Sequence, residues 1–254
     1  MNHNKDYLKK VERITFNQFK KMAQDDSLSP HEKIGFPNEY REQYTEAIFN
    51  DICNKLQALN GSHKKIADIG CGCDALALKM LDFGKKHGHQ LYMLDSQEML
   101  DLLPNDSFVH KVPGQFPKEE TFLEENKEQF DAILVYSVMQ HIILEDNPFT
   151  FIDRAVDLLA PSGRILLGDL PNRTKRKRFF LSPEGIRTHQ EYTNSNELPK
   201  VDMTELEPEK IDDSLIFAIL FRYRMAGLET YLLPQSAECP MANRREDIII
   251  EKRK

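Results

Sequence analysis

Short apolar runs that alternate with helical segments constrain this chain more than any other feature. From about residue 65 onwards, each run of mostly apolar residues is followed by a longer stretch with the spacing of an amphipathic helix. That alternation is typical of βαβ units, in which a helix crosses back over a parallel sheet between consecutive strands. The sequence therefore predicts an α/β fold with a mostly parallel sheet and helices on both of its faces.

The expected elements follow from this pattern. Strands are expected at about 65–69, 90–94, 108–111, 131–135, 163–169, 229–233 and 247–252. Helices are expected at about 75–87, 97–102, 119–128, 150–159 and 213–226. Residues 1–60 read as a helical segment, with helices at about 7–23 and 39–59, and residues 170–210 read as a turn-rich insertion over the sheet. We therefore predict a lid at 1–60 and a domain at 61–254 with a cap at about 170–210.

Composition excludes several classes of protein. The chain has 34 Lys and Arg against 41 Asp and Glu, a net charge of -7, which argues against a general affinity for nucleic acid or anionic lipid. Its four cysteines have neither the number nor the spacing of a disulfide framework or a zinc site, so we expect no metal. We find no signal peptide and no run of eighteen apolar residues, and expect a cytoplasmic protein with no membrane partner.

The segment IADIGCGCDALALKM carries the most specific signal. An apolar strand ends at Asp68, Gly70 and Gly72 follow, and a helix begins. Glycines are needed there because a Cβ would strike the backbone or an approaching ligand. A second carboxylate, Asp95, ends the next predicted strand, where it can accept hydrogen bonds from both hydroxyls of a ribose. Together these features predict a nucleoside-containing cofactor at the tips of the first two strands.

Two cofactor classes compete for this site. Gly70, Gly72 and Ala75 satisfy the dinucleotide fingerprint, which would make the chain an NAD-dependent oxidoreductase. However, Asp68 and Asp74 flank the glycines, and their charges would repel a pyrophosphate at this helix N-terminus. The two carboxylates favour instead a nucleoside that carries an ammonium and a sulfonium.

These residues resemble the class I S-adenosylmethionine-dependent methyltransferases. DIGCGCD is similar to the family's first motif, LYMLDSQEML to its second, and QFDAILVYSVMQHI and LLAPSGRILLGDLPN to its fourth and fifth strands. The end of the chain, from GLETYLLPQ to RREDIIIEKR, resembles the strand pair that closes the family's sheet. The likeness covers about 64–170 well and 212–252 loosely. In one departure, Asp74 replaces the motif's third glycine, and we expect it to cap the helix instead.

The resemblance implies a Rossmann-like sheet of seven strands in the order 3-2-1-4-5-7-6, with the seventh antiparallel, and S-adenosyl-L-methionine as the cofactor. It also implies a set of cofactor-binding residues. These are Asp68, Gly70 and Gly72 at the methionine end, Asp95, Ser96 and Gln97 at the ribose, Gln115 and Phe116 at the adenine, and Tyr136, Ser137 and Val138 near the sulfur.

An alcohol-type oxygen acceptor also needs a base, whereas a carboxylate or phosphate acceptor is already ionised. His141, just after the fourth strand, and Asp169, at the end of the fifth, are the candidate catalytic residues; either could instead be structural. The basic run at 173–178 could hold an anionic group or simply be solvated. The candidate acceptor-binding residues are Phe36, Tyr40 and Arg41 in the lid and Arg173 and His189 in the insertion.

The sequence thus predicts a methyltransferase for a small polar or anionic acceptor, methylated at oxygen, of the phosphorylated or nucleotide-linked kind. A slight resemblance of residues 31–44 to methyltransferases encoded with bacterial surface-sugar and capsule-modification enzymes adds one class of acceptor. An RNA methyltransferase, an NAD-dependent oxidoreductase and a non-catalytic cofactor-binding protein remain as alternatives. The oligomeric state is left open.

Overall fold

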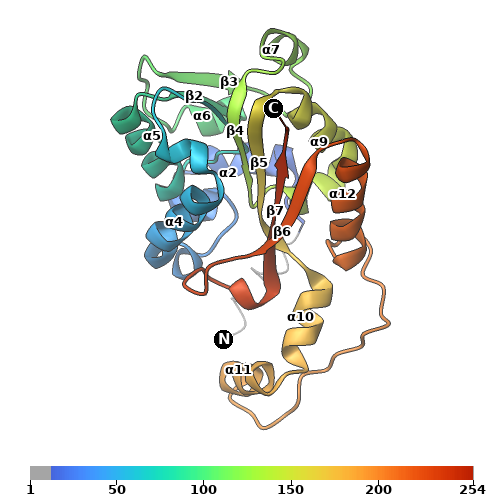
Figure 1. Cartoon of the computed structure of the whole chain (residues 1–254). Coiled ribbons are helices and arrows are strands. Elements are labelled where there is room, and N and C mark those ends of the chain that lie inside the picture. The colour runs from blue at the N-terminus through green and yellow to red at the C-terminus, as the bar shows by residue number, and fades with distance from the viewer. Residues whose placement is uncertain (1–12, 254) are drawn as a thin grey trace.

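A seven-stranded sheet forms the centre of the molecule in a computed structural model that describes residues 13–253 (Figure 1). The strands lie in the order β3-β2-β1-β4-β5-β7-β6. Their bounds are β1 Lys65–Ile69, β2 Gln90–Asp95, β3 Val109–Pro113, β4 Phe130–Tyr136, β5 Leu159–Pro171, β6 Glu229–Pro234 and β7 Arg245–Glu251. Strands β1 to β5 are parallel, and β7 is antiparallel to both β5 and β6. The predicted fold class and strand order are confirmed.

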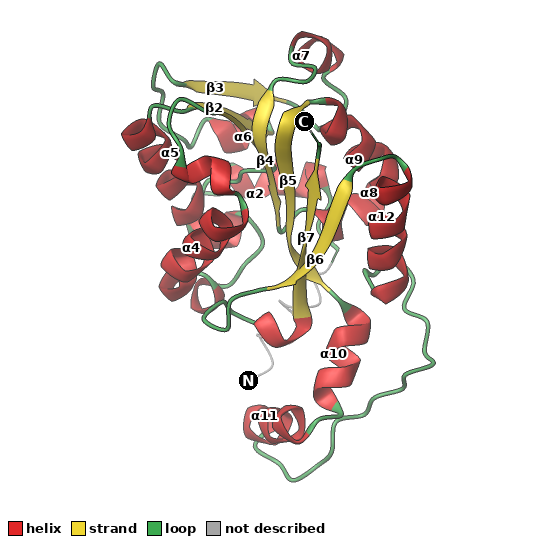
Figure 2. Cartoon of the chain, in the orientation of Figure 1, coloured by secondary structure: helices red, strands yellow, loops and turns green. Residues whose placement is uncertain are grey.

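Helices cover both faces of this sheet (Figure 2). One face carries α4 (Thr45–Lys55), α5 (Ala75–His87) and α6 (Gln97–Leu100). The other carries α7 (Glu120–Glu125), α8 (Met139–Glu145), α9 (Pro148–Asp157) and α12 (Asp213–Met225). Because both faces are covered, the central strands bury side chains in two cores: in β4, Ile133 and Val135 pack in one and Ala132 and Leu134 in the other. No helix within residues 13–253 is long and apolar enough to span a bilayer.

The N-terminal segment differs from its prediction in its helix boundaries. The first helix, α2 (Phe16–Ala23), begins later than expected, because Thr15 and Gln18 form a capping box at its start. The part of the predicted helix before residue 13 lies outside the described residues. The second predicted helix starts only at Thr45, in α4, after the short helix α3 (Pro30–Lys33) and two 3₁₀ turns at Asn38–Tyr40 and Glu42–Tyr44.

The insertion at 170–210 is more helical than predicted. It forms α10 (Arg173–Phe180) and α11 (Pro183–Thr193), which extend beyond the end of β5 (Figure 1). Asn172 caps α10 by accepting hydrogen bonds from the backbone N–H groups of Thr174 and Lys175. Carboxylates offset its cationic side chains, as when Glu207 lies 3.1 Å from Arg173 and 3.5 Å from Lys177. The basic run is therefore largely paired within the protein rather than presented to a polyanion.

Candidate active site

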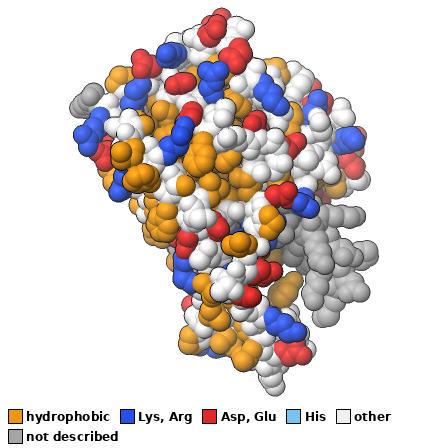
Figure 3. All heavy atoms as spheres, turned by 90° about the vertical axis from the view of Figure 1, so that its right-hand side faces the viewer, with side chains coloured by type: hydrophobic (Ala, Val, Ile, Leu, Met, Phe, Trp, Pro, Cys, Tyr) orange, Lys and Arg blue, Asp and Glu red, His pale blue; other side chains and the backbone are white. Residues whose placement is uncertain are grey.

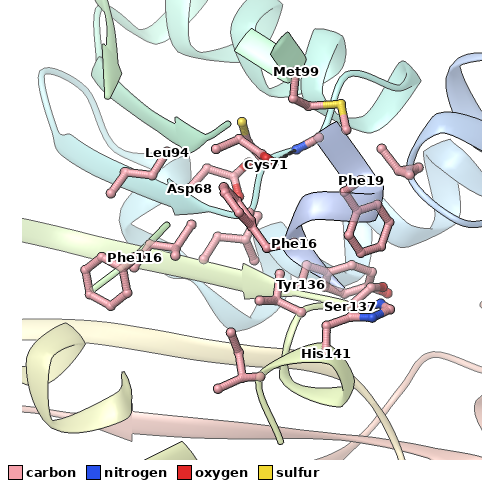
Figure 4. A pocket seen from close by; sticks show the side chains of 18 of the residues that line it. Phe16, Phe19, Asp68, Cys71, Leu94, Met99, Phe116, Tyr136, Ser137 and His141 are labelled. Atoms are coloured by element: carbon pink, nitrogen blue, oxygen red, sulfur yellow. Dashed lines mark hydrogen bonds between the residues drawn. The ribbon is translucent and has the colours of Figure 1, made fainter. Parts of the chain in front are cut away.

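A cavity lies at the C-terminal ends of β1, β2 and β4. In an open parallel sheet this edge is where ligands bind, because the chain crosses to opposite faces on either side of it. Side chains from the strand tips, from α2 and from α8 converge on the cavity, among them Asp68, Phe16 and His141 (Figure 4). The cavity is therefore lined both by the tips of the strands and by residues of the N-terminal segment.

The glycine turn after β1 forms one wall of the cavity. Gly70 and Gly72 have φ of +74° and +64°, a region that residues with a Cβ rarely adopt. A Cβ on Gly70 would lie 2.5 Å from Val138 Cγ2, and one on Gly72 would lie 2.7 Å from Ile34 Cγ2. Both positions therefore require glycine, for conformation and for space.

Two carboxylates, the buried Asp68 and the partly exposed Asp95, face the cavity at the tips of β1 and β2. Burial, followed by the negative charges of Asp95 and Asp74, raises the pKa of Asp68 to about 8. Burial also raises the pKa of Asp95 to about 6, although its carboxylate accepts hydrogen bonds from the N–H groups of Gly72 (3.0 Å) and Ser96 (2.7 Å). Among residues 13–253, nothing donates a hydrogen bond to the Asp68 carboxylate or forms an ion pair with it. Asp68 and Asp95 thus bring two acidic groups to the site, and no cation among residues 13–253 forms an ion pair with either of them.

Asp74, the residue in place of the third motif glycine, caps α5 as expected. Its Oδ1 accepts hydrogen bonds from the backbone N–H groups of Leu76 (3.0 Å) and Ala77 (3.4 Å), and His31 Nδ1 lies 3.3 Å from its Oδ2. This carboxylate thereby satisfies the first N–H groups of the helix that a phosphate would otherwise occupy.

Arg41, Ser137 and Asp169 form a hydrogen-bonded chain beside the cavity. Arg41 Nη2 donates to Ser137 Oγ at 2.6 Å, and Ser137 Oγ donates to Asp169 Oδ2 at 2.5 Å. Ser137 and Asp169, at the ends of β4 and β5, have φ of +60° and +59°, so both hold a strained backbone conformation. Arg41 is buried and stacks on Phe36 with its guanidinium carbon 4.0 Å from the ring centre. Arg41, Ser137 and Phe36 line the cavity.

Asp169, which the sequence predicted to face the acceptor, is not among the residues that line the cavity, although it contacts Ser137 and Arg41, which are. Its carboxylate accepts hydrogen bonds from Ser137, Arg245 and Gln235, and its N–H donates to the buried Asp247 at 2.8 Å. With these partners Asp169 fixes the end of β5 rather than offering a free base.

His141 does line the cavity, from the first turn of α8. Its Nδ1 lies 3.0 Å from the carbonyl oxygen of Ile14, and because a carbonyl only accepts, Nδ1 carries the proton and Nε2 keeps the lone pair. Phe19 packs edge-on against the imidazole, with ring centres 4.8 Å apart. Burial lowers the pKa of His141 to about 4, so the ring is neutral at pH 7.

The N-terminal segment closes one side of the cavity through residues that the sequence did not single out. Phe16 and Phe19 of α2 line it, and the backbone N–H of Phe16 donates to Glu145 Oε2 of α8 at 2.6 Å. The apolar periodicity of 7–23 indicated a buried face on this helix, but its partner could not be read from the sequence.

A second cavity adjoins the first. Phe36 and His141 line both; Arg173, Lys210 and Arg245 bring positive charge to the second, and Glu209 brings a negative charge. Arg173, a predicted acceptor residue, is therefore one cavity removed from the glycine turn. The first cavity contains the glycine turn, Asp68 and Asp95, and the second contains more cationic side chains. His141 lines both cavities.

The other predicted site residues fall into two groups. Gln115, Phe116, Tyr136 and Val138 line the first cavity. Ser96, Gln97, Tyr40 and His189 do not line either cavity. Ser96 caps α6 and Gln97 donates to Asp101 on the surface, and their predicted contact with the ribose stays a prediction. His189 packs against Phe180, between α10 and α11.

Comparisons with known proteins identify the family. The model of a family described as "Methyltransferase domain" matches residues 40–200, which include the glycine turn, Asp95 and His141. The chain belongs to this methyltransferase family. As a methyltransferase with the class I fold, it uses S-adenosyl-L-methionine as its methyl donor. The alternative of an NAD-dependent oxidoreductase is thereby set aside.

Solved structures of methyltransferases share the fold at low sequence identity. The plantazolicin methyltransferase BpumL, solved with a monoazolic desmethylPZN analog and SAH, is 15% identical, with a TM-score of 0.57 over 98% of this chain and 99% of that one. The CurJ carbon methyltransferase is 14% identical, with a TM-score of 0.57 over 98% of this chain and 67% of that one. In a comparison with curated proteins, none matches this chain.

Proposed function

We propose that this methyltransferase acts on a small acceptor that carries an anionic or polar group, and that it methylates an oxygen atom. The assignment of the cofactor rests on the two carboxylates at the strand tips, Asp68 and Asp95, with which no cation among residues 13–253 forms an ion pair. When bound, S-adenosylmethionine supplies a methyl group activated by a sulfonium, so the protein contributes mainly alignment and exclusion of water.

The cofactor-binding residues are assigned by their place around the first cavity. Asp68 would pair with the ammonium group of the donor, because its own carboxylate has no partner among the described residues. Asp95 would accept hydrogen bonds from the ribose hydroxyls, since its two oxygens keep lone pairs beyond those used by Gly72 and Ser96. Gln115 and Phe116 would contact the adenine, and Ser137 and Val138 would lie beside the reacting sulfur.

We assign the binding site of the acceptor to the boundary between the two cavities. Arg41 lines the first cavity, and its guanidinium, which can donate five hydrogen bonds, donates one to Ser137 at 2.6 Å and lies 3.7 Å from Asp169 Oδ2. Arg173, Lys210 and Arg245 line the second cavity together with Glu209. Arg173 also pairs with Glu207 and Arg245 with Asp169, so a carboxylate or phosphate of the acceptor would share these cations with carboxylates of the chain. This charge supports an acceptor with an anionic group, including phosphorylated or nucleotide-linked compounds.

His141 is the proposed base for an oxygen acceptor. Ile14 holds the Nδ1 proton, so Nε2 is the atom that would accept the proton of an acceptor hydroxyl as the methyl group arrives. A pKa of about 4 keeps the imidazole unprotonated at pH 7 but makes it a weak base, which suits an acidic hydroxyl better than an alcohol. Residues 13–60 would act as a lid, because α2 and the Ile34–Arg41 stretch line the cavity from outside the sheet.

Calorimetry with S-adenosylhomocysteine and NAD tests the cofactor assignment directly. Binding of the first and not the second is expected, and Asp95→Ala should abolish it, whereas Asp101→Ala, a nearby surface carboxylate, should not. Unchanged binding by Asp95→Ala would contradict the ribose assignment.

A panel of carboxylated and phosphorylated hydroxy compounds, incubated with labelled S-adenosylmethionine, tests the acceptor class. Once an acceptor is found, His141→Asn should reduce kcat and leave the affinity for S-adenosylhomocysteine unchanged. Full turnover by His141→Asn would remove this residue from the proposed mechanism.

A further inference from the structure

Aromatic side chains are concentrated at one end of the first cavity. Phe and Tyr make up 9% of the chain but a larger share of the residues that line this cavity. Two of the rings, Phe116 and Phe151, pack edge-on against each other at the proposed adenine site. The others, together with one histidine, form what we call the aromatic wall: Phe16, Phe19, Phe36, Tyr136 and His141. Figure 4 draws three of its rings together on one side of the cavity and Phe116 on the other.

Neighbouring groups hold the rings of the aromatic wall in place. Phe19 meets the imidazole of His141 edge-on, with ring centres 4.8 Å apart. The guanidinium carbon of Arg41 lies 4.0 Å from the centre of the Phe36 ring and 5.6 Å from that of Tyr136, so one cation contacts both rings. Rings that are already held in place lose little conformational freedom when a ligand packs on them.

Few polar groups next to the aromatic wall remain for the hydroxyl groups of a ligand. Ser137 accepts a hydrogen bond from Arg41 and donates one to Asp169. Glu145, which is exposed, already accepts a hydrogen bond from the backbone. His141 Nε2 has no hydrogen-bond partner among residues 13–253, because only Nδ1 is paired.

This shortage of partners disfavours a sugar or another polyol as the acceptor. Such a compound would bury several hydroxyl groups beside the aromatic wall, and each buried hydroxyl group without a partner costs free energy. A flat ring with one hydroxyl group beside His141 avoids that cost and gains contact with the surrounding rings.

We propose that the acceptor is a planar aromatic compound that packs on the aromatic wall and presents a hydroxyl group on its ring to His141. This inference rests on the proposed function, from which it takes oxygen as the methylated atom and His141 as the base. The ring oxygen bonds to the methyl carbon of the donor, the electron pair of the broken carbon–sulfur bond stays on the sulfur, and the hydroxyl proton passes to Nε2.

The acidity of a ring hydroxyl group suits this base. Burial lowers the pKa of His141 to about 4, so its imidazole accepts a proton only weakly. A phenolic hydroxyl group has a pKa of about 10, whereas that of an alcohol is close to the value for water, about 16. Proton transfer to His141 is therefore about a millionfold less unfavourable from a ring hydroxyl group than from an alcohol.

Calorimetry on the complex with S-adenosylhomocysteine tests the proposal with matched pairs of ligands. The aromatic members are para-hydroxybenzoate, hydroxynaphthoate and hydroxyquinoline carboxylate, and each is paired with its fully saturated analogue, which keeps the hydroxyl and carboxylate groups. At least one aromatic member should bind about tenfold more tightly than its analogue, because only a flat ring can stack. Equal affinities within every pair, or no binding by any aromatic member, would overturn the proposal.

Two substitutions in the aromatic wall test where the ring packs. Phe19→Leu and Phe36→Leu each remove a ring but keep an apolar side chain, and each should weaken binding of the tightest aromatic ligand by about three- to tenfold. The control is Phe217→Leu, in α12, the helix on the side of the molecule that Figure 3 shows. Phe217 is 57% exposed and lines neither cavity, so its replacement should leave the affinity unchanged. Wild-type affinity in both Phe19→Leu and Phe36→Leu would overturn packing on the wall.

Mass spectrometry of the product separates this inference from the proposed function. With labelled S-adenosylmethionine, we expect the methyl group on the ring oxygen of the aromatic ligand. A saturated hydroxy acid that is methylated at oxygen in preference to its aromatic partner would overturn the aromatic acceptor and leave the proposed function intact. Methylation of an aromatic ligand at nitrogen or carbon would support the aromatic acceptor and overturn oxygen methylation.

Discussion

Binding of the methyl donor should release a proton from Asp68. In the free protein, burial and the neighbouring aspartates raise the pKa of this carboxyl to about 8, so it is mostly protonated at pH 7. The proposed partner, an ammonium group, favours the ionised form and lowers the pKa again. Affinity must therefore rise with pH and level off as the pH passes about 8.

The size of this effect follows from the raised pKa. One unit below a pKa of 8, about a tenth of the carboxyl is ionised, and two units below it, about a hundredth. The donor should thus bind about ninefold more tightly at pH 7 than at pH 6, with about 0.9 proton released at pH 7. Asp95, with a pKa of about 6, adds a factor of at most about two, and the donor's amino group stays charged over this range.

Calorimetry in two buffers with different ionisation enthalpies measures both the affinity and the protons released. S-adenosylhomocysteine is the probe, because it has the same amino acid end and does not turn over. Asp68→Asn, which does not titrate, should bind more weakly but lose most of the pH dependence. Affinity that is flat between pH 6 and pH 7 in the wild type, or equally steep in Asp68→Asn, would refute the pairing.

Further predictions concern stability and the ribose. Asp95→Ala should lose the thermal shift that S-adenosylhomocysteine produces, whereas Asp101→Ala keeps it. Because the folded-state pKa of Asp68 lies above its unfolded value of 3.8, its ionisation penalises folding increasingly from pH 3.8 to about 8, so Asp68→Asn should raise Tm most above pH 8. In the wild type the Lys55 ammonium lies 2.5 Å from Asp51 and 2.6 Å from Asp247. Lys55→Met leaves these two buried carboxylates without their cation and should lower the free energy of unfolding, measured in urea, by about 3–5 kcal/mol. Lys79→Met, at an exposed pair, should cost less than about 1 kcal/mol.

Each of these predictions has a contrary result. A Tm for Asp68→Asn that is unchanged or lower at high pH would mean that the carboxyl finds a partner in solution. Similar losses for Lys55→Met and Lys79→Met would mean that the buried pair is not a special source of stability. Retention of the thermal shift by Asp95→Ala would place the ribose elsewhere.

Elements with strong local signals were predicted well. Strand β1 and helix α5 have the bounds expected from the sequence, because glycines, the Asp74 cap and the left-handed Gly88 mark their ends. Helix α10 was predicted as a loop, because the charges that offset its basic run lie far away in sequence, at Glu207 and Asp213. Helix α8 was missed because a single short helix between a strand and Asn147 has too few turns to show a period.

The candidate site likewise contains residues that local motifs predicted and residues that only tertiary packing brings together. The strand-tip residues predicted from motifs, such as Asp68, Asp95 and Tyr136, do line the cavity, because strand order alone brings those tips together. Phe16 and Glu145 meet only through tertiary packing of α2 on α8, and no local pattern records that contact. Asp169 was placed at the correct strand end, but its partners from β7 and the stretch before it could not be foreseen.

The hydrogen bond between Ile14 and His141 links the tautomer of the imidazole to the position of the proposed lid. The same carbonyl that anchors the start of the lid also selects the tautomer of the imidazole, so a displaced lid releases the ring to rotate and to exchange its proton between the two nitrogens. In that state His141, the proposed base, would no longer be held in one orientation and tautomer to accept a proton. Nitrogen chemical shifts of this one side chain would then report, without any acceptor present, what fraction of molecules is closed.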